Sequence, residues 1–218
     1  MGAVILDTNV VSIAHLPEPP TWLINWFRRL GPEAVAISWV TVYEIEYGIR
    51  LCERSNSETA CFVLDWFEKL LNTRMYFLEM NLPASRILGE MAACSHLRQL
   101  FETQPKINKW GEHLKNEKIK LGADAMIAAM SIAYGLPIAS MNVKDFVLID
   151  RHFPLPGLYN PQIDEWVLGP PVGWGMDNNA NDDNVLSATD RPKRHEIGPE
   201  VSRRQSNLML ATREELSD

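Results

Sequence analysis

The sequence predicts an α/β fold: a three-layer α/β/α sandwich with a central, mostly parallel sheet. Short apolar runs alternate along the chain with longer amphipathic segments. Strands separated by helices of this length form a parallel sheet that is covered on both faces. The chain has 218 residues, of which 46% are apolar, and this is enough for one well-buried domain.

The predicted elements follow one another as strand and helix. An apolar run over residues 3–6 predicts the first strand, and the sequence Asp7, Thr8, Asn9 is typical of a helix start. The other predicted strands cover residues 34–38, 75–79 and 137–140, and the predicted helices cover residues 21–30, 41–52, 58–71, 84–101 and 124–134. Gly135 ends the last of these helices, and a further short helix opens at Asn142. Residues 104–120 are polar and irregular, with one helical turn expected among them.

The composition changes after residue 169. Only 14 of the 48 residues from 171 to 218 are apolar, and nine acidic against six basic residues give this stretch a charge of −3. Such a segment lacks the apolar side chains that it would need to order itself. We therefore expect a working domain of residues 1–169 and a polar, flexible tail of residues 170–218.

Net charge, apolar run length and cysteine spacing argue against a basic nucleic-acid coat protein, a membrane protein and a secreted protein. The formal net charge of −7 excludes a coat protein that grips nucleic acid by bulk positive charge. No apolar run approaches the roughly 18 to 20 residues of a membrane helix, and residues 1–7 lack the features of a secretion signal. The three cysteines, Cys52, Cys61 and Cys94, form no CxxC pair. A reduced, cytoplasmic protein is expected.

Four acidic residues follow a predicted strand or lie in the first turn of a predicted helix. They are Asp7, Glu44, Asp124 and Asp145. Ligands of open parallel sheets bind beyond the carboxyl ends of the strands. Carboxylates placed there can converge although they are far apart in the sequence.

Helix capping is the competing explanation for each acid taken singly. Asp7 and Asp124 stand at helix starts, and Thr41 has the spacing of a capping box with the glutamate at position 44. Asn142 and Asp145 repeat a cap pattern. Capping and function are equally good explanations of any one acid, but four acids in equivalent places favour a common site.

Convergent carboxylates require a cation, because each raises the pKa of the others. Oxygen ligands suit Mg²⁺, or Mn²⁺ as a substitute, better than zinc. The five histidines show no HxxxH spacing, so we expect them to be ordinary surface or core residues. Two Mg²⁺ ions on carboxylates are a recurrent device for phosphodiester hydrolysis.

Four motifs occur in a fixed order along the chain. They read MGAVILDTNVV at 1–11, ISWVTVYEIEYGI at 37–49, ADAMIAAMSIAYGL at 123–136 and PIASMNVKDF at 137–146, and YNP follows at 159–161. Together they resemble a PIN-domain ribonuclease, and more narrowly the VapC and FitB-like toxins of bacterial toxin–antitoxin pairs. The resemblance spans about residues 3–166. It implies a PIN-like fold, a Mg²⁺-dependent endoribonuclease that leaves 5′-phosphate and 3′-hydroxyl ends, a cognate antitoxin and a homodimer.

The same resemblance implies roles for individual residues. Asp7 matches the family's first metal-binding aspartate, Glu44 the glutamate of its second motif, and Asp124 its central metal-binding aspartate. Thr8 and Asn9 are expected to hydrogen-bond to Asp7 and orient it, with a plain helix-start role as the equal alternative.

Two glutamates compete for the second motif. Position 44 is favoured because an aliphatic residue, Ile45, follows it directly and Gly48 follows three positions later, as in the family. Glu46 is then expected to be solvated or to pair with Arg50 at i+4.

The fourth ligand is open between Asn142 and Asp145, and we favour Asp145 for its charge. The family's strand ends on Thr-Arg-Asn or Thr-x-Asp, whereas this chain reads Ser140, Met141, Asn142. The serine can keep the threonine's hydroxyl role, but the methionine removes a cation that could touch phosphate.

The role of one group of lysines and two alternative functions stay open from the sequence. A concentration of lysines within residues 106–120 is either a solvated face or a contact for RNA phosphates. A PIN-like protein that binds RNA or a partner without cutting is the alternative to an enzyme. A HAD-like phosphatase is less favoured, because it needs Asp-x-Asp and the chain has Asp7, Thr8, Asn9.

Overall fold

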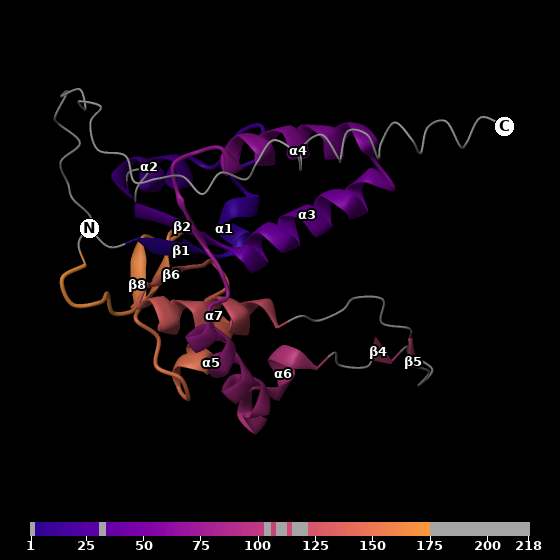
Figure 1. Ribbon diagram of the computed structural model, residues 1–218. Coiled ribbons are helices and arrows are strands. Elements are labelled where there is room, and N and C mark those ends of the chain that lie inside the picture. Colours follow the sequence, from indigo (N-terminus) through magenta and orange to yellow (C-terminus); the bar gives the residue numbers. More distant parts are fainter. Residues whose placement is uncertain (1–2, 31–33, 103–105, 108–112, 115–121, 175–218) are drawn as a thin grey trace. The chain divides into compact units, whose positions relative to one another are not determined.

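The computed structural model describes residues 3–30, 34–102, 106–107, 113–114 and 122–174. A six-stranded sheet lies at the centre, in the order β3-β2-β1-β6-β7-β8 (Figure 1). Its strands are β1 (Val4–Leu6), β2 (Val35–Ser38), β3 (Tyr76–Leu78), β6 (Ile138–Ala139), β7 (Leu158–Asn160) and β8 (Glu165–Leu168). All neighbouring pairs are parallel except β7 with β8.

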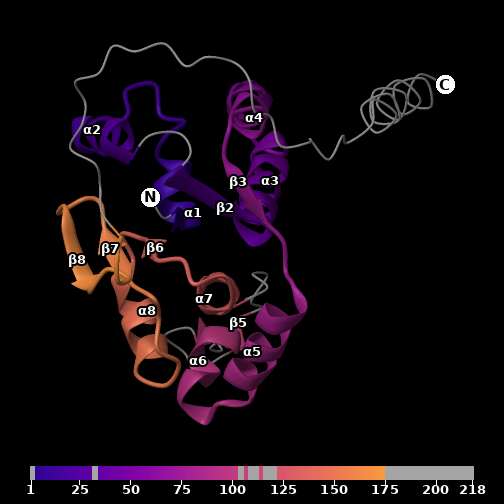
Figure 2. The same cartoon turned by 60° about the vertical axis from the view of Figure 1, so that its left-hand side comes forward.

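Helices cover both faces of this sheet (Figure 2). One layer holds α1 (Thr8–Ser12), α2 (Thr21–Leu30), α3 (Trp39–Glu53) and α4 (Ser57–Leu71). The other holds α5 (Leu82–Ala93), α6 (Arg98–Phe101), α7 (Ala123–Tyr134) and α8 (Val143–Asp150). The predicted three-layer α/β fold with a mostly parallel sheet is confirmed.

Each central strand supplies side chains to two separate hydrophobic cores. In β1, Val4 and Leu6 point into the core beneath α2 and α3, whereas Ile5 points into the core beneath α5 and α7. The residues of β2 alternate in the same way, because successive side chains of a strand point to opposite faces. All three residues of β1 are buried, so its apolar run needs no polar face.

The strand order reverses at β1. The chain leaves β1 toward β2 on one side, and it returns later to β6 on the other side. Leu6 pairs with Ala139 at the carboxyl end of this junction. In open α/β sheets such a reversal opens a crevice beyond the strand ends, where ligands bind.

The structure corrects the prediction of one helix over residues 84–101. The helix ends at Ala93, Cys94 has extended backbone angles of φ −74° and ψ 117°, and a 3₁₀ turn (η2, Ser95–Leu97) leads into α6. Leu97 and Leu100 are 0% and 2% exposed. The bend therefore allows both leucines to enter the core that α5 and α7 share.

Strands β7 and β8 were absent from the predicted elements. The stretch predicted to be irregular contains two short paired strands, β4 (Lys106–Ile107) and β5 (His113–Leu114). The lysine side chains of this stretch lie outside the described residues, as does the predicted tail from residue 175 on. No helix among the residues described is long and apolar enough to cross a membrane.

Candidate functional site

Asp7 and Ser140 meet where the sheet order reverses. They follow the paired residues Leu6 and Ala139 of two adjacent parallel strands, so the register brings them side by side. The Ser140 hydroxyl donates a hydrogen bond of 2.6 Å to Asp7 Oδ2. The two residues are 4% and 0% exposed, so this is a buried contact between the ends of β1 and β6.

Asn9 fastens the loops that follow the same two strands. Its Nδ2 donates to Asp7 Oδ2 at 2.7 Å and to Ser140 Oγ at 3.1 Å, and its Oδ1 accepts the backbone N–H of Met141 at 3.2 Å. The backbone N–H of Asn142 donates to Ser140 Oγ at 3.0 Å. Asn9 and Ser140 therefore hold the Asp7 carboxylate in one orientation.

Glu44 approaches from α3. Its Oε2 accepts a 2.6 Å hydrogen bond from the Thr8 hydroxyl, which corrects the prediction that this side chain orients Asp7. The alternative of a capping box starting at Thr41 is wrong, because Ser38 caps α3 and its side chain accepts from the Thr41 backbone N–H. Glu44 is thus free of a capping role and lies in the second turn of its helix.

The second glutamate of this motif has a different partner. Glu46 Oε1 lies 2.6 Å from Arg50 Nη2 on the surface of α3. The predicted i+4 ion pair is confirmed, and it leaves Glu44 as the glutamate of this motif that contacts the residues after β1.

Asp124 lies in the first turn of α7. The residue before this helix, Gly122, has φ +67° and provides no side-chain cap. Burial is the main reason why the pKa of Asp124 rises from 3.8 to about 7, followed by the charges of Asp7 and Asp145, a hydrogen bond to Asp145, and the charge of Glu44. These couplings show that α7 brings Asp124 near the other three acids.

The pKa of Asp7 is raised as well, from 3.8 to about 6. Burial is again the main cause, and the negative charge of Glu44 acts in the same direction. The hydrogen bond from Ser140 opposes the rise because it stabilises the ionised form. Asp7 occupies the N-cap position of α1, and the backbone N–H groups of Thr8 and Asn9 also stabilise its ionised form, so a helix-start role accompanies its place among the other acids.

Asp145 and Asn142 both lie at the start of α8. Asn142 precedes the helix, makes no side-chain capping bond, and donates Nδ2 to Asp145 Oδ2 at 3.4 Å. Asp145 is hydrogen-bonded to Asp124, and its negative charge raises the pKa of Asp124. The choice between the two as fourth ligand stays a prediction, and these contacts favour Asp145.

The donor set of this cluster, hereafter the acidic site (Asp7, Glu44, Asp124 and Asp145), consists of oxygen atoms from four elements. Within the described ranges, no three of its acids have donor atoms that all lie within 4.8 Å of one another. Mg²⁺ is commonly bound through the oxygen atoms of one or two carboxylates and keeps several of its waters, so the chemistry of these donors does not require three of them to meet. The residues present therefore fit a hard divalent cation.

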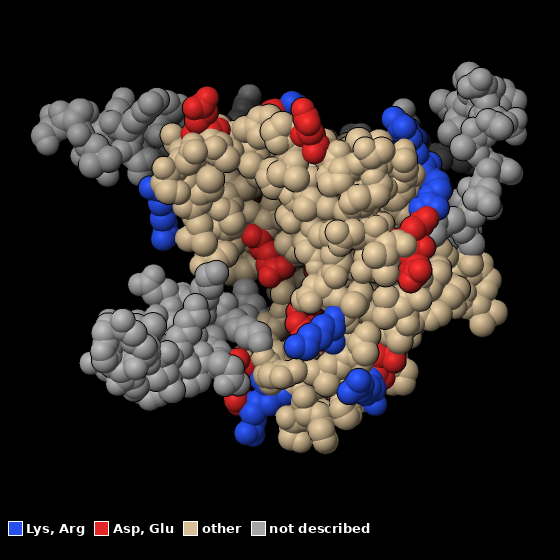
Figure 3. All heavy atoms as spheres, turned by 180° about the vertical axis from the view of Figure 1, so that it is seen from behind, with Lys and Arg blue, Asp and Glu red and all other residues tan. Residues whose placement is uncertain are grey.

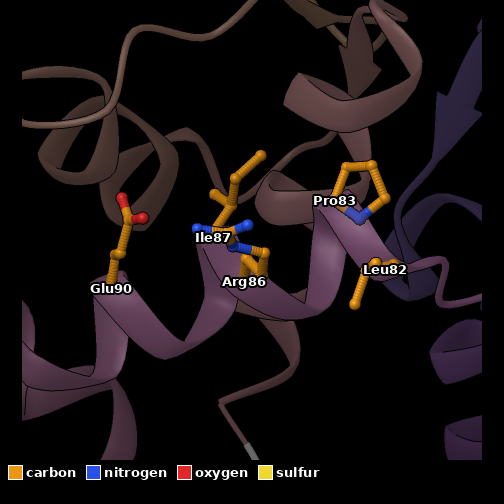
Figure 4. A pocket seen from close by; sticks show the side chains of 5 residues that line it. All are labelled: Leu82, Pro83, Arg86, Ile87 and Glu90. Carbon is orange, nitrogen blue, oxygen red and sulfur yellow. The ribbon is translucent and has the colours of Figure 1, made fainter.

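The surface around the domain is mixed in charge. On the face opposite to Figure 1, Lys and Arg side chains are scattered among Asp and Glu, and acidic groups lie in the indented middle of this face (Figure 3). A shallow hollow elsewhere is lined entirely by α5 and includes no residue of the acidic site (Figure 4). Its lining residues are Leu82, Pro83, Arg86, Ile87 and Glu90.

The raised pKa values predict how stability without metal depends on pH. Folded Asp124 and Asp7 hold protons at pH values where the unfolded chain has lost them, so their contribution is complete below about pH 4 and is lost as pH rises to about 7. Between pH 5 and pH 8, in chelator, the free energy of unfolding of wild type should fall by roughly 1 to 3 kcal/mol more than that of Asp124→Asn. Urea denaturation measures both.

Asp65→Asn is the matched control, because Asp65 lies on the surface of α4 and pairs with Lys69 at 2.5 Å. It should follow wild type at both pH values. Equal pH dependence of wild type and Asp124→Asn would contradict the assignment of a proton to this partly buried carboxyl.

Comparison with known proteins gives relatives of low identity. No family model matches the chain. It is 26% identical over 143 residues to a plasmid stability protein, StbB, from Pseudomonas syringae pv. tomato, covering 66% of this chain and 90% of that protein. The structure of DNA-bound VapBC from Salmonella typhimurium is similar at a TM-score of 0.50 and 22% identity, covering 74% of this chain and 99% of that one. The structure of VapBC2 from Rickettsia felis has a TM-score of 0.48 and 22% identity, and the match covers 75% of this chain and 98% of that one. At 22% identity the Salmonella structure shows a shared α/β fold.

Proposed function

We propose that the chain is a Mg²⁺-dependent endoribonuclease. The observation that carries the proposal is the convergence of acids from β1, α3, α7 and α8 at the carboxyl end of the sheet, where β1 and β6 meet. The coupled charges of Asp7, Glu44 and Asp145 around Asp124 are the arrangement that a divalent cation neutralises. The order of the motifs supports an RNA phosphodiester as the substrate.

In this mechanism the acidic site holds the cation. Ser140 and Asn9 both donate to Oδ2 of Asp7, so these two side-chain bonds leave Oδ1 as the oxygen that would face the metal. Thr8 does the same for Glu44, because it donates to Oε2 and leaves Oε1 outside that bond. When bound, Mg²⁺ supplies a Lewis acid that activates water for in-line attack on the phosphodiester and stabilises the leaving oxygen.

Substitution of a metal ligand should reduce cleavage more than substitution of a residue that orients a ligand. Asp124→Asn should abolish Mg²⁺-dependent cleavage of RNA, whereas Ser140→Ala should reduce it by about 10- to 100-fold, because it frees the Asp7 carboxylate to rotate. A fluorescent RNA assay with Mg²⁺, and with Mn²⁺ in its place, measures both effects.

Asp65→Asn serves again as the control and should cleave as wild type does. Cleavage by Asp124→Asn at the wild-type rate would contradict the mechanism. RNA binding without any cleavage by wild type would favour the alternative of a non-cutting PIN-like protein. The observation behind this alternative is that Met141 stands where the family can have an arginine.

We also propose that the nuclease is the toxin of a toxin–antitoxin pair, active in the cytoplasm as a homodimer and held inactive by a cognate antitoxin. The description of the 26% identical relative as a plasmid stability protein supports this role. The DNA-bound VapBC complex, which shares the fold, supports a protein partner.

Induced expression in a bacterial host should therefore arrest growth, and Asp7→Asn should relieve the arrest, because it removes a charged ligand without removing the hydrogen-bonding side chain. Growth curves measure the arrest, and immunoblots check that wild type and Asp7→Asn are expressed to the same level. Arrest by Asp7→Asn as strong as that of wild type would contradict a toxic role of the cleavage reaction.

A further inference from the structure

A second group of metal-binding side chains lies away from the acidic site. Cys94, His96 and His152 each place one donor atom within 4.8 Å of the others' donors. The rings of His96 and His152 stack at 4.6 Å between centroids, with planes 22° apart. We propose that these three residues, hereafter the Cys-His-His cluster, form a binding site for Zn²⁺.

Buried neighbours hold the first two ligands in place. Cys94 leaves the end of α5 with its N–H bonded to the carbonyl of Met91 at 3.1 Å, and its own carbonyl accepts the N–H of Leu97 at 3.0 Å. Met91 and Leu97 are both 0% exposed. The bend that interrupts the predicted helix therefore presents Cys94 and His96 from a rigid turn.

The third ligand arrives from the end of α8. The His152 N–H donates to the carbonyl of Ile149 at 2.9 Å, and Ile149 is 0% exposed. His152 is 56 residues from His96 in sequence, so the sheet and its helices create this proximity. Bound Zn²⁺ would join the ends of two segments, α5 with η2 and α8, that both pack in the core around α7.

The donor chemistry selects zinc rather than magnesium. Thiolate and imidazole are preferred ligands of Zn²⁺, and a site with three protein ligands keeps a fourth, open position for water. Tetrahedral Zn²⁺ would need donor separations of about 3.3 to 3.8 Å, which small rotations of the side chains supply, since both histidines are exposed and Cys94 is partly exposed. The acidic site, with oxygen donors alone, suits the harder ion.

Metal titration of the full chain tests the proposal. Chelator-treated protein in a thiol-free reductant is titrated with Zn²⁺ against a chromophoric chelator, and with Co²⁺ while its absorption is recorded. We expect about one Zn²⁺ per chain and, with Co²⁺, a thiolate charge-transfer band together with tetrahedral visible bands. Cys94→Ser should abolish the charge-transfer band and weaken Zn²⁺ binding by at least about 100-fold.

Cys61→Ser is the matched control, because Cys61 is an exposed free thiol on α4, and it should bind as wild type does. His152→Ala provides a second variant at an exposed position, and it should lower Zn²⁺ affinity and abolish the Zn²⁺-dependent rise in melting temperature. Unchanged Zn²⁺ affinity in Cys94→Ser, or the absence of the cobalt band from wild type, would overturn the proposal. None of these readouts involves RNA cleavage, so they separate this site from the proposed nuclease.

Discussion

The hydrogen bond between Ser140 and the Asp7 carboxylate is the interaction on which the site depends. It joins the ends of β1 and β6 inside the domain, where an ionised carboxylate is costly unless it is hydrogen-bonded or paired. Two side-chain donors partly compensate that cost, yet the pKa of Asp7 still stands near 6. A cation beside it would complete the compensation. The fold therefore places a chemical need for positive charge at the point where its strand order reverses.

The alternation of short apolar runs with longer amphipathic segments was sufficient to predict the parallel sheet and the order of its central elements along the chain. The apolar runs at 3–6 and 34–38 contain β1 and β2. Both strands are buried on both faces, so a continuous apolar run is enough to identify them. The acids after these strands could be selected for the same reason: parallel strands bring their carboxyl ends to one edge. Their convergence on Asp124 follows from topology rather than from any local pattern.

What the sequence did not predict depends on contacts between distant segments. The break at Cys94 has no glycine or proline to mark it, and it arises because Leu97 turns into the core. Strand β8 was not predicted, and its contact with the sheet includes Trp166 packed on Tyr159, with ring centroids 5.2 Å apart. The histidines were expected to be ordinary surface or core residues, because the Cys-His-His cluster has only one local pair, Cys94 with His96, and His152 follows the end of α8.

The acidity of the chain has a different meaning once the acids are placed. A formal charge of −7 opposes the binding of RNA if it is spread over the surface. Four of the charges instead belong to coupled carboxyls at one end of the sheet, and two of these carboxyls have pKa values raised to about 6 and 7. Divalent cations bound there would reverse the local field, so affinity for RNA phosphates would depend on metal. Oxygen donors in one place and sulfur and nitrogen donors in another would keep two kinds of ion apart.

The central claim is that the acidic site holds a divalent cation, and Mn²⁺ titration followed by electron paramagnetic resonance tests it most directly. Free Mn²⁺ gives a signal that is lost on binding, so the titration counts bound ions without any assumption about substrate. If the acidic site holds the cation, wild type and Asp65→Asn bind Mn²⁺ competitively with Mg²⁺, Asp124→Asn loses this binding, and Cys94→Ser retains it. Equal binding by wild type and Asp124→Asn, or no binding by wild type, would contradict it.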